Sequence, residues 1–132
     1  MQQAKAPFDL DSFESDPPYH ESDGVTYGRS RIEKTFHGDI EGTGTGEMLS
    51  VRTDSGGTGY VALERITGMV HRRSGSFAVL HVGTMTEDGQ WARWPISPGS
   101  GTGELAGIKG EARIEIAADG AHTLFLDYEL ES

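Results

Sequence analysis

Five polar side chains of this sequence could meet inside one enclosed site and exchange protons or donate hydrogen bonds there. They are Glu41, Tyr60, Glu64, His81 and Glu104. Each lies in or next to a segment with alternating apolar residues, and a strand repeat of two can point it toward the apolar side. Desolvation raises the pKa of a carboxylate between apolar walls, which suits it to acid/base work near neutral pH. The set predicts acid/base chemistry on an enclosed small molecule.

Glu64 has the clearest sequence context of the five. It shares one strand face with Tyr60 and Ile66, so we expect Glu64 to be buried if Ile66 is buried. In the acid/base hypothesis Glu64 or Glu104 exchanges the proton, while Tyr60 and His81 orient or polarise the bound molecule.

A structural role for the same carboxylates is the alternative. Glu64 or Glu104 could pair with Arg65, with Arg93 or with backbone amides at a glycine turn. Ion pairs of this kind also shift pKa values without any catalytic role.

Metal and cofactor sites find little support in the sequence. His37, Asp39 and Glu41 are spaced by two, as ligands on one strand face would be, but Gly38 and Asp39 predict a turn that interrupts the alternation. Gly99, Gly101 and Gly103 precede a strand pattern and no helix, so they do not predict a phosphate loop. We expect no metal and no cofactor.

The segments that would position these side chains all read as strands. Alternating runs separated by Gly, Pro and Asp turns occupy residues 8–14, 25–37, 39–51, 60–71, 75–85, 90–98, 103–117 and 122–131. Helical spacing with capping residues is absent. The pattern predicts an all-β fold, an antiparallel barrel of roughly eight strands. We expect a flexible tail over residues 1–7 and a single barrel domain over residues 8–132.

The segment 75–85 is apolar on both faces. One face carries Phe77, Val79 and His81, and the other carries Ala78, Leu80 and Val82. A strand that is apolar on both sides needs a cover on its outer face, and a subunit interface is one way to supply it. We therefore expect a homo-oligomer.

Composition limits the partners and the compartment. The 132 residues carry a formal net charge of −10, so nucleic acids and anionic membranes are disfavoured as partners. There is no cysteine, which rules out disulfides and thiol chemistry. The segment 1–22 is polar and acidic, unlike a signal peptide, and no window is apolar enough to span a bilayer. We expect a cytoplasmic protein.

Several motifs together resemble a family of small bacterial proteins of unknown function with an allene oxide cyclase-like barrel. The resemblance covers nearly the whole chain after Phe8, and its most specific part is the run Ser-Gly-Thr-Gly-Glu-Leu-x-Gly. The motifs occupy residues 38–42, 60–68, 75–77, 99–110 and 126–130. The resemblance implies an eight-stranded barrel of the allene oxide cyclase-like or calycin-like class.

Barrels of that class cyclise or isomerise reactive small molecules, or hold apolar ligands in the lumen. Plant allene oxide cyclases use a water held by an asparagine, and this chain has no asparagine, so that mechanism is not carried over. We expect a barrel that binds a small apolar molecule in its lumen; if it is an enzyme, we expect a cofactor-independent isomerase or cyclase. The alternatives are a non-catalytic carrier of an apolar ligand and a structural subunit whose barrel is packed solid.

Overall fold

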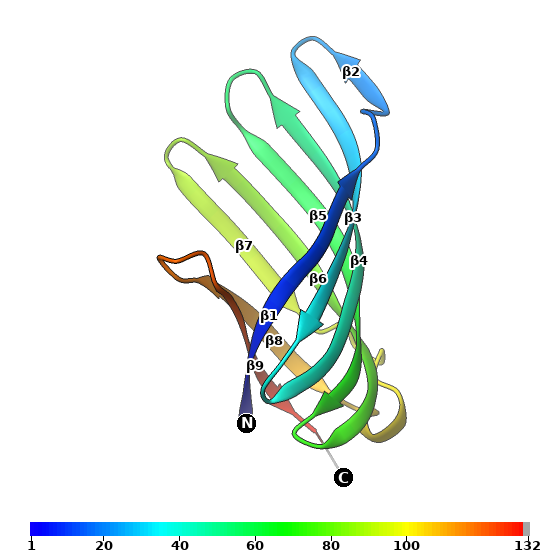
Figure 1. The fold of residues 1–132 in the computed structure, drawn as a ribbon. Coiled ribbons are helices and arrows are strands. Elements are labelled where there is room, and N and C mark those ends of the chain that lie inside the picture. Colours follow the sequence, from blue (N-terminus) through cyan, green and yellow to red (C-terminus); the bar gives the residue numbers. More distant parts are fainter. Residues whose placement is uncertain (131–132) are drawn as a thin grey trace.

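The computed structural model describes residues 1–130 and contains one antiparallel sheet (Figure 1). Its elements are β1 (Gln2–Ser15), β2 (His20–Ser22), β3 (Val25–Phe36), β4 (Ile40–Thr53), β5 (Thr58–Val70), β6 (Arg73–Thr86), β7 (Gly89–Pro95), the short 3₁₀ helix η1 (Gly103–Leu105), β8 (Lys109–Ile116) and β9 (His122–Glu129). Neighbouring strands pair in the order β1-β9-β8-β7-β6-β5-β4-β3-β2, and β1 also pairs with β3.

The pairing of β1 with β3 closes the sheet into a ring. The fold is a closed eight-stranded antiparallel barrel, with β2 as an extra strand on the edge of β3. The predicted fold class is therefore confirmed. Among the described residues no helix is long and apolar enough to cross a membrane.

Alternation along the strands decides which side chains face the lumen. In β6, Phe77, Val79 and His81 are buried inside the barrel, while Ala78 and Leu80 between them are only half-buried. The same alternation runs along β5, where Ile66 and Glu64 are buried and Leu63 and Arg65 are exposed. The period of two in the sequence therefore builds both the inner and the outer surface.

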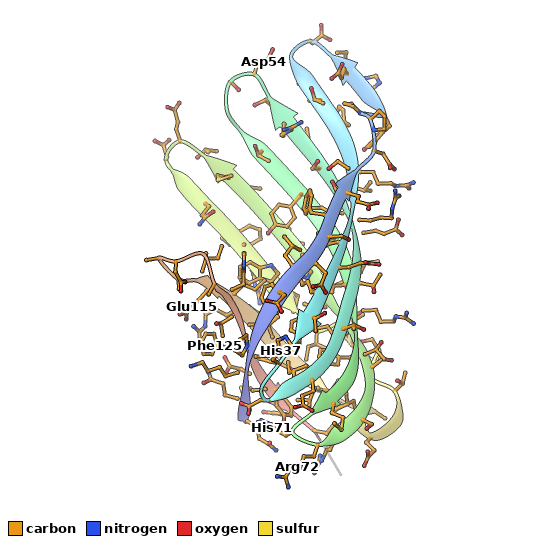
Figure 2. The ribbon with its side chains drawn as sticks, viewed as in Figure 1. His37, Asp54, His71, Arg72, Glu115 and Phe125 are labelled. Atoms are coloured by element: carbon orange, nitrogen blue, oxygen red, sulfur yellow. The ribbon has the colours of Figure 1, made fainter. Side chains whose placement is uncertain are left out.

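The two ends of the barrel differ. The turn with His71 and Arg72 lies at the end that we call the closed end, and the turn with Asp54 lies at the opposite, open end (Figure 2). Apolar side chains fill the closed half, among them Phe36, Ile40, Ile66, Val70, Phe77, Leu105, Ile108, Leu124 and Leu126. One half of the barrel is thus a packed core, and any site for a ligand must lie nearer the open end.

The N-terminal segment differs from the expectation. Residues 1–7 were expected to form a flexible tail, but β1 begins at Gln2, and Ala4 and Ala6 are fully buried. Ala4 is paired with Leu126 and Ala6 with Leu124. The tail prediction is wrong because small alanines give a weak hydrophobic signal, yet they fit closely into the core beside the leucines of β9.

The glycine-rich segment before β8 also differs. A strand was expected over 103–117, but residues 103–105 form η1 and β8 begins at Lys109. Leu105 and Ile108 are buried near the closed end. The strand expected over 122–131 is β9, which ends at Glu129; residues 131–132, part of the expected domain, lie outside the described residues.

Strands β7 and β8 share fewer paired residues than any other two neighbouring strands of the ring, and we call the boundary between them the β7–β8 seam. They pair only at Trp94 with Ala112 and at Pro95 with Glu111. Towards the open end, β7 and the β8–β9 hairpin diverge (Figure 1). The hydrogen-bonded wall of the barrel is therefore interrupted between them.

Candidate functional site

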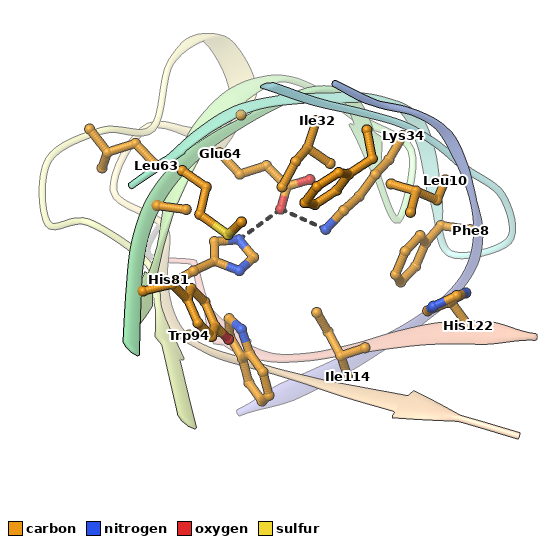
Figure 3. A pocket seen from close by; sticks show the side chains of 15 residues that line it. Phe8, Leu10, Ile32, Lys34, Leu63, Glu64, His81, Trp94, Ile114 and His122 are labelled. Carbon is orange, nitrogen blue, oxygen red and sulfur yellow. Dashed lines mark hydrogen bonds and ion pairs between the residues drawn. The ribbon is translucent and has the colours of Figure 1, made fainter. Parts of the chain in front are cut away.

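A cavity of about 330 Å³ lies in the lumen above the packed half. Its walls are mostly apolar, with Phe8 and Leu10 from β1, Ile114 from β8 and Trp94 from β7 (Figure 3). A space of this size and polarity is typical of a site for a small organic molecule.

Three charged or titratable side chains form one wall of this cavity. Lys34 of β3, Glu64 of β5 and His81 of β6 are 8%, 4% and 8% exposed, and we call them the charged cluster. Lys34 Nζ lies 3.2 Å and His81 Nε2 lies 2.8 Å from the same oxygen, Glu64 Oε1 (Figure 3). Each of the three points inward because the residues two positions away, such as Phe36 and Ile66, belong to the core.

The charge state of Glu64 follows from its neighbours. Burial raises the pKa of the Glu64 carboxyl, but the hydrogen bond from His81 and the charge of Lys34 outweigh it and hold that pKa below its ordinary value. Glu64 is therefore ionised at neutral pH, contrary to the expected raised pKa. Because an ionised carboxylate only accepts hydrogen bonds, His81 Nε2 carries the proton.

The second oxygen of Glu64 is buried in a tight space. Oε2 has no hydrogen-bond partner among the described residues. A Cβ atom at Gly44 of β4 would lie 2.2 Å from Oε2 and 2.9 Å from the ring of Phe36. Gly44 is therefore required for Glu64 to adopt this position, and Oε2 keeps an unused capacity to accept a hydrogen bond.

The ammonium group of Lys34 also contacts an aromatic ring. Lys34 Nζ lies 4.8 Å from the centroid of the Phe8 ring, which stabilises the cation in an otherwise apolar place. Lys34 was not among the predicted site residues. Its alternation with Ile32 and Phe36 could have indicated an inward side chain, but lysine is rarely buried, so the pattern is easily taken for surface charge.

Tyr60 and Trp94 lie on the open side of the charged cluster. The pKa of the Tyr60 hydroxyl is raised, because burial raises it more than a hydrogen bond with the Trp94 side chain lowers it. The Tyr60 ring packs over Gly83 of β6, where a Cβ atom would lie 2.6 Å from a ring carbon. Trp94 meets His81 edge-on, with ring centroids 6.5 Å apart.

The structure brings together three of the five predicted site residues. Tyr60, Glu64 and His81 line the same cavity. Glu41 does not, because β4 begins after the turn at residues 37–39 in a phase that buries Ile40 and leaves Glu41 exposed.

Glu104 is also outside the lumen. It lies in η1, is exposed, and accepts a hydrogen bond of 3.1 Å from the backbone N–H of Ser74. The predicted inward placement of Glu41 and Glu104 is therefore wrong. For Glu104 the reason is that a helical turn replaces the expected strand and removes the alternation.

Among residues 1–130 no group of three or more His, Asp or Glu side chains could hold a metal ion. His37 instead pairs with Asp9, and Asp39 accepts a hydrogen bond from the backbone of Lys5.

The closed barrel, with one packed half and an apolar cavity beside buried charges, makes the chain a small β-barrel protein with a cavity in its lumen. The chain belongs to the family of proteins of unknown function DUF3224, whose family model matches residues 4–128. The predicted membership in a family of unknown function is thereby confirmed, while the likeness to allene oxide cyclase barrels stays a prediction.

One solved structure is similar over the full length. It is a protein of unknown function from the DUF3224 family of Shewanella oneidensis MR-1, with 35% sequence identity and a TM-score of 0.91, and the match covers 100% of this chain and 99% of that chain. No curated protein matches the chain.

Proposed function

We propose that the lumen binds a small, mostly apolar molecule that carries one uncharged oxygen acceptor, such as a carbonyl group. The observation that carries this proposal is the apolar cavity of about 330 Å³ whose inner wall holds buried hydrogen-bond donors. Apolar ligand surface would pack on the walls, and the donors would fix its orientation.

The donors favour an acceptor on the ligand. A lysine ammonium has three N–H groups, and the Lys34 side chain hydrogen-bonds to one partner, Glu64, among residues 1–130. The remaining N–H groups face Phe8 and the cavity that Lys34 lines. A ligand oxygen can accept one of them.

The charges favour a neutral head group. The positive charge of Lys34 is already offset by the negative charge of Glu64. A ligand ion buried here would lose its hydration without gaining a free counter-charge, which is costly in an apolar cavity. A carbonyl or hydroxyl group avoids that cost.

Isomerisation or cyclisation is a second candidate function. It is favoured by the convergence of a carboxylate and two hydrogen-bond donors, Glu64 with Lys34 and His81, on one cavity. A donor could polarise a carbonyl while Glu64 removes a nearby proton. However, Oε1 already accepts two hydrogen bonds and the lowered pKa makes Glu64 a weak base, so the geometry supports binding better than catalysis.

The first test compares ligands of equal chain length and different head groups. We expect octan-2-one to bind more tightly than octanoate or octylammonium in isothermal titration calorimetry. The variant K34M/E64Q removes both buried charges, and we expect it to fold and to bind octan-2-one roughly tenfold more weakly, the cost of one hydrogen bond from a charged donor. The surface pair variant R113M/E115Q is the matched control and should bind as the wild type does.

Two results would contradict the proposal. One is the absence of binding of all three ligands to the wild type. The other is an unchanged affinity for octan-2-one in a folded K34M/E64Q variant. Native mass spectrometry of the protein purified from its own host would give the mass of any molecule that co-purifies with it. Incubation of the protein with that molecule would then reveal a product if the barrel is catalytic.

A further inference from the structure

The lumen cavity continues towards the open end as a second apolar space. A cavity of about 360 Å³ lies along β7 and β8, and Tyr60, Trp94 and Ile114 line both cavities. The two cavities therefore adjoin at these three side chains, and the second lies between the charged cluster and the rim formed by β7 and β8. A compact ligand would occupy only its inner part.

We propose that this second space is the binding site for a long alkyl chain, so that the ligand is an amphiphile whose chain passes Trp94 and Ile114 and leaves the barrel between β7 and β8. This inference rests on the proposed function, because the head group of the ligand occupies the cavity beside the charged cluster. It adds the ligand class, a long-chain carbonyl compound, and the path by which that ligand enters.

The seam between β7 and β8 supplies the opening. Pairing between these strands ends at Trp94 and Ala112, and no residue of β7 before Trp94 pairs with β8. β7 and the β8–β9 hairpin diverge at this place (Figure 1), and residues of both β7 and β8 line the second cavity there. Unlike the other seams of the ring, this one has no continuous ladder of hydrogen bonds to block a chain.

The side chains at this rim are apolar and exposed. Met85, Trp91 and Ile116 line the second cavity and are 50%, 53% and 66% exposed. Large apolar side chains gathered at the mouth of a cavity are costly in water and mark a surface that is covered by a ligand or a partner. Their continuity with the lumen points to the ligand's own chain.

The opposite side of the open end is polar. A third cavity of about 270 Å³ lies over β3 and β4, and its lining includes Ser30, Ser50, Arg52 and Asp16. Tyr60 lines this space as well as the other two. An alkyl chain that rises from the charged cluster is therefore better accommodated along β7 and β8 than along β3 and β4.

A series of methyl ketones tests this path. Hexan-2-one is short enough to lie beside the charged cluster alone, whereas the extended chains of decan-2-one and dodecan-2-one reach towards the second cavity along β7 and β8. Burial of each further methylene strengthens binding by roughly fourfold, so we expect the affinity to rise through the whole series. Trp91 and Trp94 are the two tryptophans of the chain, and their emission reports the binding.

A variant at the rim separates the chain site from the head-group site. In Ile116→Asp a charged group stands where the chain leaves the barrel, and we expect dodecan-2-one to bind at least tenfold more weakly while hexan-2-one binds as before. Met69→Asp is the matched control, because Met69 is an exposed apolar side chain on the outer face of β5 and lines none of these cavities. It should change neither affinity.

The outcomes distinguish the two proposals. Equal affinities for hexan-2-one and dodecan-2-one would overturn the chain site and leave the head-group site intact. An equal loss for both ketones in Ile116→Asp would also overturn it. If no ketone binds to the wild type, the proposed function fails and the chain site fails with it.

Discussion

Glu64 holds a negative charge in the lumen because two donors converge on one of its oxygens. Lys34 and His81 come from different strands, yet both reach Oε1. Removing one member of a buried pair leaves the other charge without compensation, whereas removing both charges together avoids that penalty. The cluster therefore behaves as a unit in mutagenesis.

We expect Lys34→Met to lower the free energy of unfolding by about 3–5 kcal/mol, because Glu64 keeps a buried and poorly compensated charge. In the double variant K34M/E64Q most of this loss should be recovered. Urea unfolding followed by circular dichroism measures both. Equal losses in the single and the double variant would show that packing of the lysine stem, and not charge pairing, is what matters.

The lowered pKa of Glu64 predicts an acid-sensitive component of stability. Its pKa is lower in the folded chain than in the unfolded chain, where it is about 4.3, so the unfolded state binds the proton more readily. The stabilisation is fully present above that value and is lost as the pH falls through the lower, folded pKa. The hydrogen bond from His81 and the positive charge of Lys34 cause it.

Glu64→Gln removes this component. We expect the variant to lose less stability than the wild type between pH 5 and pH 2, as measured by urea unfolding at each pH. Glu104→Gln serves as the control, because Glu104 is an exposed carboxylate outside the lumen. Parallel stability curves for wild type and Glu64→Gln would contradict the assignment.

At the scale of elements, β1 is the strand that closes the barrel. It pairs with β9 on one side and with β3 on the other, and its alanines face the core. Tyr128 of β9 adds a polar connection there, because its hydroxyl lies 3.1 Å from Gln2 Oε1 and 2.5 Å from His71 Nδ1. The hydroxyl joins the first strand to the turn between β5 and β6.

Deletion of residues 2–7 should therefore destabilise the whole barrel. It removes the partner of β9 and uncovers Leu124 and Leu126, two side chains whose burial contributes roughly 3–6 kcal/mol together. Thermal unfolding checks this, with Gln3→Ala on the exposed face of β1 as the control. A truncated protein with an unchanged melting temperature would restore the original expectation of a flexible tail.

At the scale of the whole molecule, the outer surface over β4 to β6 is unusually apolar. Leu49, Val61 and Leu63 are 43%, 50% and 60% exposed there. Glu47 and Arg65 stand beside them, and neither has an ion-pair partner among the described residues. Charges of both signs beside one apolar patch suit a second copy of the same surface, which is the homo-oligomer expected from the sequence.

Leu63→Glu is the test of that surface. Two copies of the variant would bring like charges into the apolar patch, so we expect a shift from oligomer to monomer in size-exclusion chromatography with light scattering. Thr67→Glu, another outward position of β5, should leave the oligomer unchanged. A wild-type protein that is monomeric at every concentration tested would contradict the prediction of a homo-oligomer.

Alternation along the chain was enough to predict the all-β barrel and part of the candidate site. Because alternation is a local property, it correctly placed Tyr60, Glu64 and His81 on the inner face of their strands. The predicted inward orientation was wrong at two residues, because the strand alternation is interrupted before each of them. A turn precedes Glu41, and a 3₁₀ helix carries Glu104.

The contacts that these side chains make depend on long-range strand pairing. Lys34 and Glu64 are 30 positions apart, and their contact depends on the register of three paired strands, which no local pattern specifies. The same holds for the short seam between β7 and β8, since barrel closure sets how far two strands stay together. Local periodicity determines which face of its strand a side chain occupies. Long-range strand pairing determines which side chains it contacts, and those contacts set its charge state and hydrogen bonds.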